Sequence, residues 1–175
     1  LRAVIRQVEH HLAHLVSAHM LSPFAHSVVV SVDGFGDFAS AAWGVGNGTE
    51  IDVEDRVYFP HSLGIFYQAL TQYLGFPHYG DEYKVMGLAS YGDPSKYRGV
   101  FSQLVPIDER GRYRTPDLAG NGLHDFVLSH LGPARGRDEP FDSRHADIAA
   151  SLQEALTNAV LCTLKRANAE TGLKS

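Results

Sequence analysis

The chain has 175 residues, 44% of them hydrophobic, which is enough to bury a core and fits a single domain. Its formal net charge of −5 argues against binding to nucleic acid, which usually requires a basic surface. No apolar run approaches the ~20 residues that a bilayer crossing needs, and no signal peptide is visible. The composition therefore predicts a cytoplasmic protein without nucleic-acid or membrane partners.

The chain opens with a predicted helix at residues 2–21, because apolar side chains recur there with the helical period. Three runs with strand character follow, at residues 26–33, 38–46 and 49–58. The first run is β-branched and leads into a glycine turn at residues 33–37, with the sequence Asp-Gly-Phe-Gly-Asp. The second and third runs are joined through Gly46-Asn47-Gly48, which is typical of a hairpin.

The middle of the chain is less regular. A helix is predicted at residues 62–74, with Ser62 as its N-cap, and a shorter helix at residues 82–89. Residues 95–142 contain scattered glycine, proline and charge, so we predict an insertion or peripheral layer with a hairpin around residues 108–111.

The last predicted helix spans about residues 144–171 and stops at Gly172. The single cysteine, Cys162, lies on its apolar side, which indicates a buried small hydrophobe and not a nucleophile. One cysteine cannot form an internal disulfide, which fits a reducing compartment. Three successive strands between long helices favour an α/β layered domain over a helical bundle.

Two histidines stand out on the first predicted helix. At ~100° per residue, His10 and His14 lie ~40° apart, opposite the apolar stripe, so their imidazoles are neighbours that could share one metal ion. His11 and His19 fall at the edge and centre of the stripe and are better candidates for packed or capping residues. Glu9 precedes the pair instead of lying within it, which excludes the zincin pattern. The alternative is an ordinary solvent-facing pair, because a stable metal site needs a third ligand.

The glycine turn could supply that ligand. Asp33 ends a predicted strand at the carboxyl edge of the sheet, where α/β folds place ligands. Gly34 and Gly36 would let the backbone approach a phosphate, whereas the carboxylates of Asp33 and Asp37 would repel it unless a cation bridged them. A plain β-turn is the alternative. Because the first helix ends a short loop before this strand, Asp33 could complete a site with the two histidines.

Three blocks of sequence resemble, in the same order, the carbamoyltransferases that modify nodulation factors and antibiotics. They are Glu9–Leu15 with Ser17 and Ala18, Asp33–Asp37, and Gly80–Gly92. The last helix, especially Asp147–Glu154, resembles the related tRNA threonylcarbamoyl transferases. The resemblance covers nearly the whole chain and is least clear over residues 95–142.

The resemblance implies an actin-like, Hsp70-like ATPase fold of the ribonuclease H-like class. Residues 1–175 would form part of the carbamoyltransferase domain, as the first half of that fold, with a mixed β-sheet flanked by helices. Such enzymes make carbamoyl-adenylate from carbamoyl phosphate and ATP in a separate C-terminal domain. They then transfer the carbamoyl group to a hydroxyl of a sugar or natural-product acceptor.

The resemblance also implies roles for individual residues. His10, His14 and Asp33 would hold a divalent metal against the nucleotide phosphate, with iron expected first and zinc or magnesium as alternatives. The phosphate turn would be lined by Gly34, Gly36 and Asp37.

Two residues further along the chain match a block near the nucleotide in this family, namely Glu82 and Lys84. Lys84 would act with Asp33 in catalysis by pairing with phosphate as a point charge. The alternative for Lys84 is a solvated ion pair with Glu82.

The family's opening strands, a further aspartate ligand and the adenylate-forming domain are not in this sequence. We therefore expect the rest of a longer polypeptide as a partner, and expect the chain alone to be inactive and to bind metal weakly. Two other functions stay open. A tRNA threonylcarbamoyl transferase is disfavoured by the block at residues 84–89 and by the lack of a basic face. A non-catalytic ATP- or metal-binding module is the other.

Overall fold

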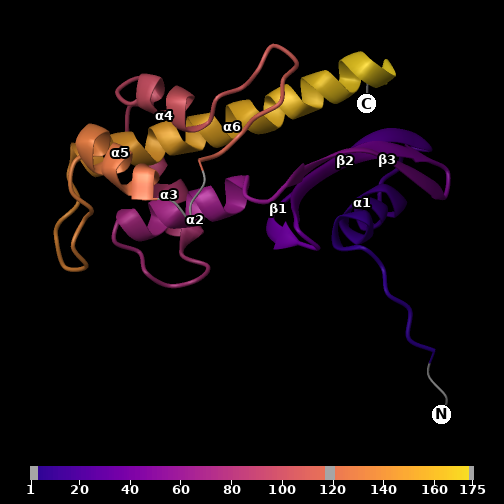
Figure 1. Ribbon diagram of the computed structural model, residues 1–175, viewed down its shortest axis with the longest axis horizontal. Helices are drawn as coiled ribbons and strands as arrows, with labels where there is room; N and C mark the ends of the chain where they lie inside the picture. Colours follow the sequence, from indigo (N-terminus) through magenta and orange to yellow (C-terminus); the bar gives the residue numbers. More distant parts are fainter. Residues whose placement is uncertain (1–3, 117–120, 174–175) are drawn as a thin grey trace.

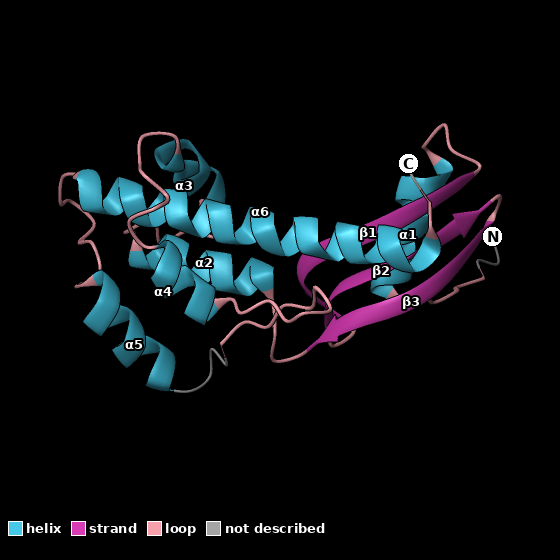
Figure 2. Ribbon diagram, turned by 90° about the horizontal axis from the view of Figure 1, so that it is seen from above, coloured by secondary structure: helices cyan, strands magenta, loops and turns pink. Residues whose placement is uncertain are grey.

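The computed structural model describes residues 4–116 and 121–173 and has two parts joined by one long helix (Figure 1). A three-stranded sheet with helices on its faces forms one part, and a cluster of shorter helices forms the other (Figures 1 and 2). Along the chain the elements are α1 (His10–Met20), β1 (His26–Gly36), β2 (Ala39–Asn47), β3 (Glu50–Tyr58), α2 (Leu63–Tyr73), α3 (Glu82–Ala89), α4 (Arg98–Leu104), α5 (Asn121–Leu131) and α6 (Ser143–Thr171). The predicted α/β class is therefore confirmed.

The sheet is a meander with the order β1-β2-β3, which confirms the three predicted strands. Both described pairings are antiparallel, whereas the resemblance implies a mixed sheet. β1 also continues past Asp33 to Gly36, with an irregular register between Val32 and Gly36. The turn itself is made by Asp37 and Phe38, whose φ values are 50° and 65°. Positive φ at two central residues is what a tight hairpin with the natural strand twist requires.

The two faces of the sheet are covered by different helices, α1 on one side and the C-terminal half of α6 on the other (Figure 1). Alternate residues of β1 face opposite ways, so Ser27, Val29 and Ser31 contact α1. On the α6 side, Asp55 of β3 pairs with Arg166 at 2.8 Å. This arrangement leaves the end of β1 beside the start of α1.

The first helix begins at His10 and not at residue 2 as predicted. Glu9 is its N-cap, and the Glu9 carboxylate accepts hydrogen bonds from the backbone amides of His11 and Leu12 at 3.1 and 2.7 Å. The apolar residues that suggested a longer helix are exposed, at 80% for Val4, 90% for Ile5 and 63% for Val8. Helical spacing alone was misleading because the helix starts only after Glu9, so these residues precede it and do not pack on the sheet. Residues 1–3 lie outside the described residues.

The helices at 62–74 and 82–89 are confirmed. Ser62 caps α2 by accepting from the Ile65 amide at 3.1 Å, and its hydroxyl donates to the Gly34 carbonyl at 2.7 Å. This second bond connects the start of α2 to the last residues of β1.

The region 95–142 is more regular than predicted, because it contains α4 and α5, and its interpretation as an insertion stays a prediction. Both helices contribute to the main core with α2 and α6, through Phe101, Leu104, Val127 and Leu131. At seven and eleven residues they are too short for periodicity to identify them reliably. The small hairpin is confirmed by a bridge between Ile107 and Tyr113, and residues 117–120 lie outside the described residues.

The last helix matches its prediction closely. α6 ends at Gly172, which has the left-handed φ of 69° that favours glycine. Ile148, Leu152 and Ala159 are buried along its stripe, and Cys162 is half-buried. Among the helices of the described segments, none combines the length and apolar character that a bilayer crossing requires.

Candidate metal centre

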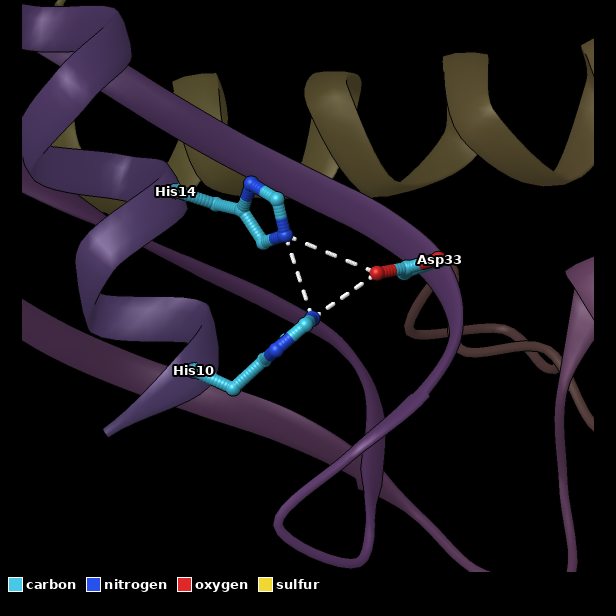
Figure 3. Close-up of side chains that lie close together, drawn as sticks. All are labelled: His10, His14 and Asp33. Carbon is cyan, nitrogen blue, oxygen red and sulfur yellow. Dashed lines mark hydrogen bonds and ion pairs between the residues drawn. The ribbon is translucent and has the colours of Figure 1, made fainter. Parts of the chain in front are cut away.

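Three side chains that the sequence selects as metal ligands meet in space, from the consecutive elements α1 and β1 (Figure 3). His10 Nε2 lies 2.8 Å from Asp33 Oδ2 and 3.1 Å from His14 Nε2. The third edge, from His14 Nε2 to Asp33 Oδ2, is 3.5 Å. The helix α1 supplies both imidazoles one turn apart, and the irregular end of β1 aims the carboxylate at them.

The triangle of ligand atoms has the size that one metal ion requires. Ligand atoms at ~2.1 Å from an ion lie ~3.0 Å apart at right angles and ~3.4 Å apart at the tetrahedral angle. The observed edges of 2.8, 3.1 and 3.5 Å span that range. A single proton on His10 Nε2 can serve only one of its two neighbours, whereas a cation would satisfy all three lone pairs at once. Two imidazoles and one carboxylate suit iron(II) or zinc.

The cluster is open on one side. The exposed fractions of the side chains are 36% for His10, 51% for His14 and 42% for Asp33. A small ligand therefore has access to an ion held there, as catalytic metal sites require.

The carboxylate of Asp33 is held in its charged form. Its hydrogen bond to His10 lowers its pKa, and the Gly34 amide donates to its other oxygen at 2.6 Å with the same effect, while partial burial works in the opposite direction. An ionised oxygen ligand is what a divalent cation needs beside two neutral imidazoles.

The start of α1 is fixed by two further carboxylates. The backbone amide of His10 donates to Asp37 Oδ2 at 2.9 Å, and Glu9, which caps the helix, also lies 3.4 Å from Arg56 Nη2. Asp37 thus holds the main chain of the residue whose ring Asp33 holds. The predicted contact of Asp37 with a phosphate stays a prediction.

The two glycines near the end of β1, Gly34 and Gly36, differ in their surroundings. A Cβ on Gly36 would lie 2.6 Å from His10 Nδ1 and closer still to other atoms of that ring. A Cβ on Gly34 would meet only Ile65 Cδ1, at an ordinary 3.5 Å. Gly36 therefore makes room for the His10 imidazole, a role that the sequence did not indicate. The predicted close approach of a phosphate to both glycines stays a prediction.

The other two predicted site residues lie on α3, among the helices at the far end of α6 from α1 (Figures 1 and 2). Lys84 Nζ pairs with Asp81 Oδ1 at 2.6 Å, and not with Glu82. This bond lowers the pKa of Asp81 and raises the pKa of Lys84. The structure does not bring Lys84 or Glu82 to the histidine cluster, so their role at a nucleotide stays a prediction.

A cavity of about 620 Å³ lies on the other face of the sheet and does not include the cluster. Its walls come from all three strands, the hairpin at residues 107–113 and α6, with Trp43, Tyr113 and Arg166 among them. The geometry of ligand atoms, and not the size of the hollow, identifies the candidate centre.

Comparison with known proteins agrees with the blocks of sequence noted above. The family model for the carbamoyltransferase N-terminus matches residues 1–175. The chain belongs to this family.

Relatives of the carbamoyltransferase N-terminal domain include two nodulation proteins. NolO of Bradyrhizobium diazoefficiens is 42% identical over 175 residues, and NolNO of Sinorhizobium fredii is 40% identical over 176 residues. An uncharacterized protein of Synechocystis is 33% identical over 174 residues. Each match covers 95% of this chain and between 24% and 29% of the relative, so the chain spans about a quarter of their length.

The sequence missed some residues that shape the site of this carbamoyltransferase domain. Glu9 caps α1, but glutamate is not among the residue types that usually mark an N-cap. The contact between Asp37 and the His10 amide joins positions 27 residues apart, which no local pattern reveals. His11 and His19 are buried, as their place on the stripe predicted.

Proposed function

We propose that this domain is the transfer module of an O-carbamoyltransferase, which passes a carbamoyl group from carbamoyl-adenylate to a hydroxyl of a sugar or natural-product acceptor. The observation that carries the proposal is the convergence of His10, His14 and Asp33 in a chain of the carbamoyltransferase family. The relatives named as nodulation proteins agree with the resemblance to carbamoyltransferases that modify nodulation factors, from which the sugar-type acceptor is proposed.

His10, His14 and Asp33 would hold the divalent ion, with iron(II) favoured by two imidazoles and one carboxylate and zinc as the alternative. When bound, such an ion neutralises charge on the adenylate phosphate and polarises the carbamoyl carbonyl. Asp33 contributes the negative charge that retains the ion, and Asp37 keeps the first turn of α1 in place. Gly36 leaves room for the His10 imidazole, and Gly34 and Gly36 would line the phosphate.

The actin-like ATPase fold is part of the same proposal. An antiparallel three-strand meander with helices on both faces fits one half of such a fold, with further strands supplied by the rest of a longer polypeptide. ATP and carbamoyl phosphate would be the co-substrates. Glu82 and Lys84 would approach the nucleotide from α3, which packs against α6.

The test uses the full-length protein that carries this domain. Carbamoyl phosphate labelled with carbon-14, ATP and an oligosaccharide acceptor are supplied, and transfer of label to the acceptor is measured. We expect His10→Ala and Asp33→Asn to abolish transfer, while ATP-dependent consumption of carbamoyl phosphate continues. His124→Ala is the matched control, because His124 is an exposed histidine of α5 beside Asp125.

Each alternative has its own signature in this assay. Transfer that survives both substitutions at the cluster would identify a non-catalytic metal-binding module. Label found on tRNA and not on the oligosaccharide would identify a threonylcarbamoyl transferase-like activity.

A further inference from the structure

A ladder of three contacts joins α1 to β1 beneath the metal cluster. His19 contacts Ser27 at one end and His11 contacts Ser31 at the other, with imidazole-to-hydroxyl distances of 2.8 and 3.0 Å. Between them lies a buried apolar rung formed by Leu15 and Val29. Four residues of helix rise ~6.0 Å and two residues of strand ~6.6 Å, so the rungs stay in step along both elements.

Of the two histidines in this ladder, His19 has hydrogen-bond partners at both ring nitrogens. Its Nε2 lies 3.1 Å from the Gly48 carbonyl, which can only accept, so Nε2 carries the proton. Its Nδ1 is then the acceptor for the Ser27 hydroxyl. The ring is thus fixed from β1 and from the turn between β2 and β3, and only 2% of the residue is exposed. Within the described part of the chain, His11 Nε2 has no hydrogen-bond partner, so His11 is held less firmly.

A glycine makes space for this rung, as another does for His10. A Cβ on Gly46 would lie 2.5 Å from Cγ and Cε1 of the His19 ring. Gly46 is not one of the glycines with positive φ, so the space and not the backbone conformation requires glycine there. Any side chain at position 46 would push the C-terminal turn of α1 away from the sheet.

The metal cluster depends on where α1 lies along β1. His10 and His19 are nine residues apart, or ~13.5 Å along the helix, so His19 fixes the end opposite the ligands. A slide of α1 by one residue is ~1.5 Å, which exceeds the tolerance of ~0.2 Å for metal–ligand distances. We propose that His19 is a positioning residue, which sets the axial register of α1 so that His10 and His14 meet Asp33. The functional part of this inference rests on the proposed metal centre. The position of α1 along β1 can be tested without the metal.

The experiment compares three variants of the full chain. Ser27→Ala removes one hydroxyl from the His19 rung, and His19→Leu removes both hydrogen bonds while keeping much of the volume. Leu15→Ala is the control, because it weakens the packing of the same face but leaves both bonds of His19 intact. Cobalt(II) affinity is measured by visible absorption and calorimetry, and the melting temperature of each variant is recorded.

We expect Ser27→Ala and His19→Leu to weaken cobalt(II) binding about tenfold or more, as loss of a supporting contact typically does. We expect Leu15→Ala to lower the melting temperature and to leave the affinity within about twofold of the parent chain. Equal loss of affinity in all three variants, or unchanged affinity in the His19→Leu and Ser27→Ala variants, would overturn the inference.

A second readout does not need the metal. The His10 ring lies against Gly36, so the Gly36 Hα resonances report the position of α1 in the metal-free chain. We expect these resonances to shift in Ser27→Ala and His19→Leu but not in Leu15→Ala. A parent chain that binds no cobalt(II) would contradict the proposed metal centre alone, and the Gly36 resonances would still decide the register.

Discussion

An alanine at position 36 would place a methyl carbon 2.6 Å from His10 Nδ1, and closer to other atoms of the ring. An ordinary contact is at least ~3.4 Å, so the imidazole must retreat by about 1 Å or the hairpin must open. Metal–ligand distances tolerate only ~0.2 Å, and His10 Nε2 is the atom nearest to both other ligands. At the proposed metal centre we therefore expect Gly36→Ala to weaken metal binding by about 100-fold, or ~2.7 kcal/mol.

The control for this substitution is Gly34→Ala in the same strand. Its new methyl group would meet Ile65 Cδ1 at 3.5 Å, and Gly34 has no positive φ, so affinity should change by less than about twofold. Zinc or cobalt(II) titration calorimetry measures both variants, with circular dichroism to show that each is folded. Parent-like affinity in Gly36→Ala, or an equal loss in Gly34→Ala, would refute the idea that Gly36 exists to admit the His10 ring.

Two further predictions concern stability. Ser62 is fully buried, caps α2 and donates a hydrogen bond to the Gly34 carbonyl. Ser62→Ala should therefore lower the free energy of unfolding, measured by urea denaturation, by about 1–2 kcal/mol. The control is Ser102→Ala at an exposed position, which should change it by less than about 0.5 kcal/mol. Burial lowers the pKa of His145 from its ordinary 6.5. Below pH 6.5 the unfolded chain then binds a proton that the folded chain does not, so the free energy of unfolding should fall as the pH drops through this range. His145→Gln should flatten that slope in urea titrations between about pH 5 and 8, and an unchanged slope would exclude His145 as its source.

The parts of the structure that sequence could predict are those set by local pattern. His10 and His14 fall on the polar side of α1 whatever its length, and a β-branched run before Asp33 places that carboxylate near the end of a strand, although β1 continues to Gly36. The strands, α2, α3 and α6 follow from period and capping in the same way. The antiparallel pairing of the sheet follows from the two short hairpins in the structure, whereas the family resemblance suggested a mixed sheet.

Other features depend on contacts between distant positions. Val4, Ile5 and Val8 continue the helical spacing, yet Glu9 caps α1 after them and leaves them exposed. The helices α4 and α5 are short and become visible only when they join the core with α2 and α6. The steric role of Gly36 likewise appears only when a ring from another element lies against it.

His10 makes two hydrogen bonds to one hairpin: its ring contacts Asp33, and its main-chain amide donates to Asp37. The two carboxylates are four residues apart, on either side of Gly36, so any displacement of this hairpin would move the ring and the main chain of His10 together. The hairpin and the first turn of α1 are therefore coupled, and His14, one turn further along the same helix, is carried with His10.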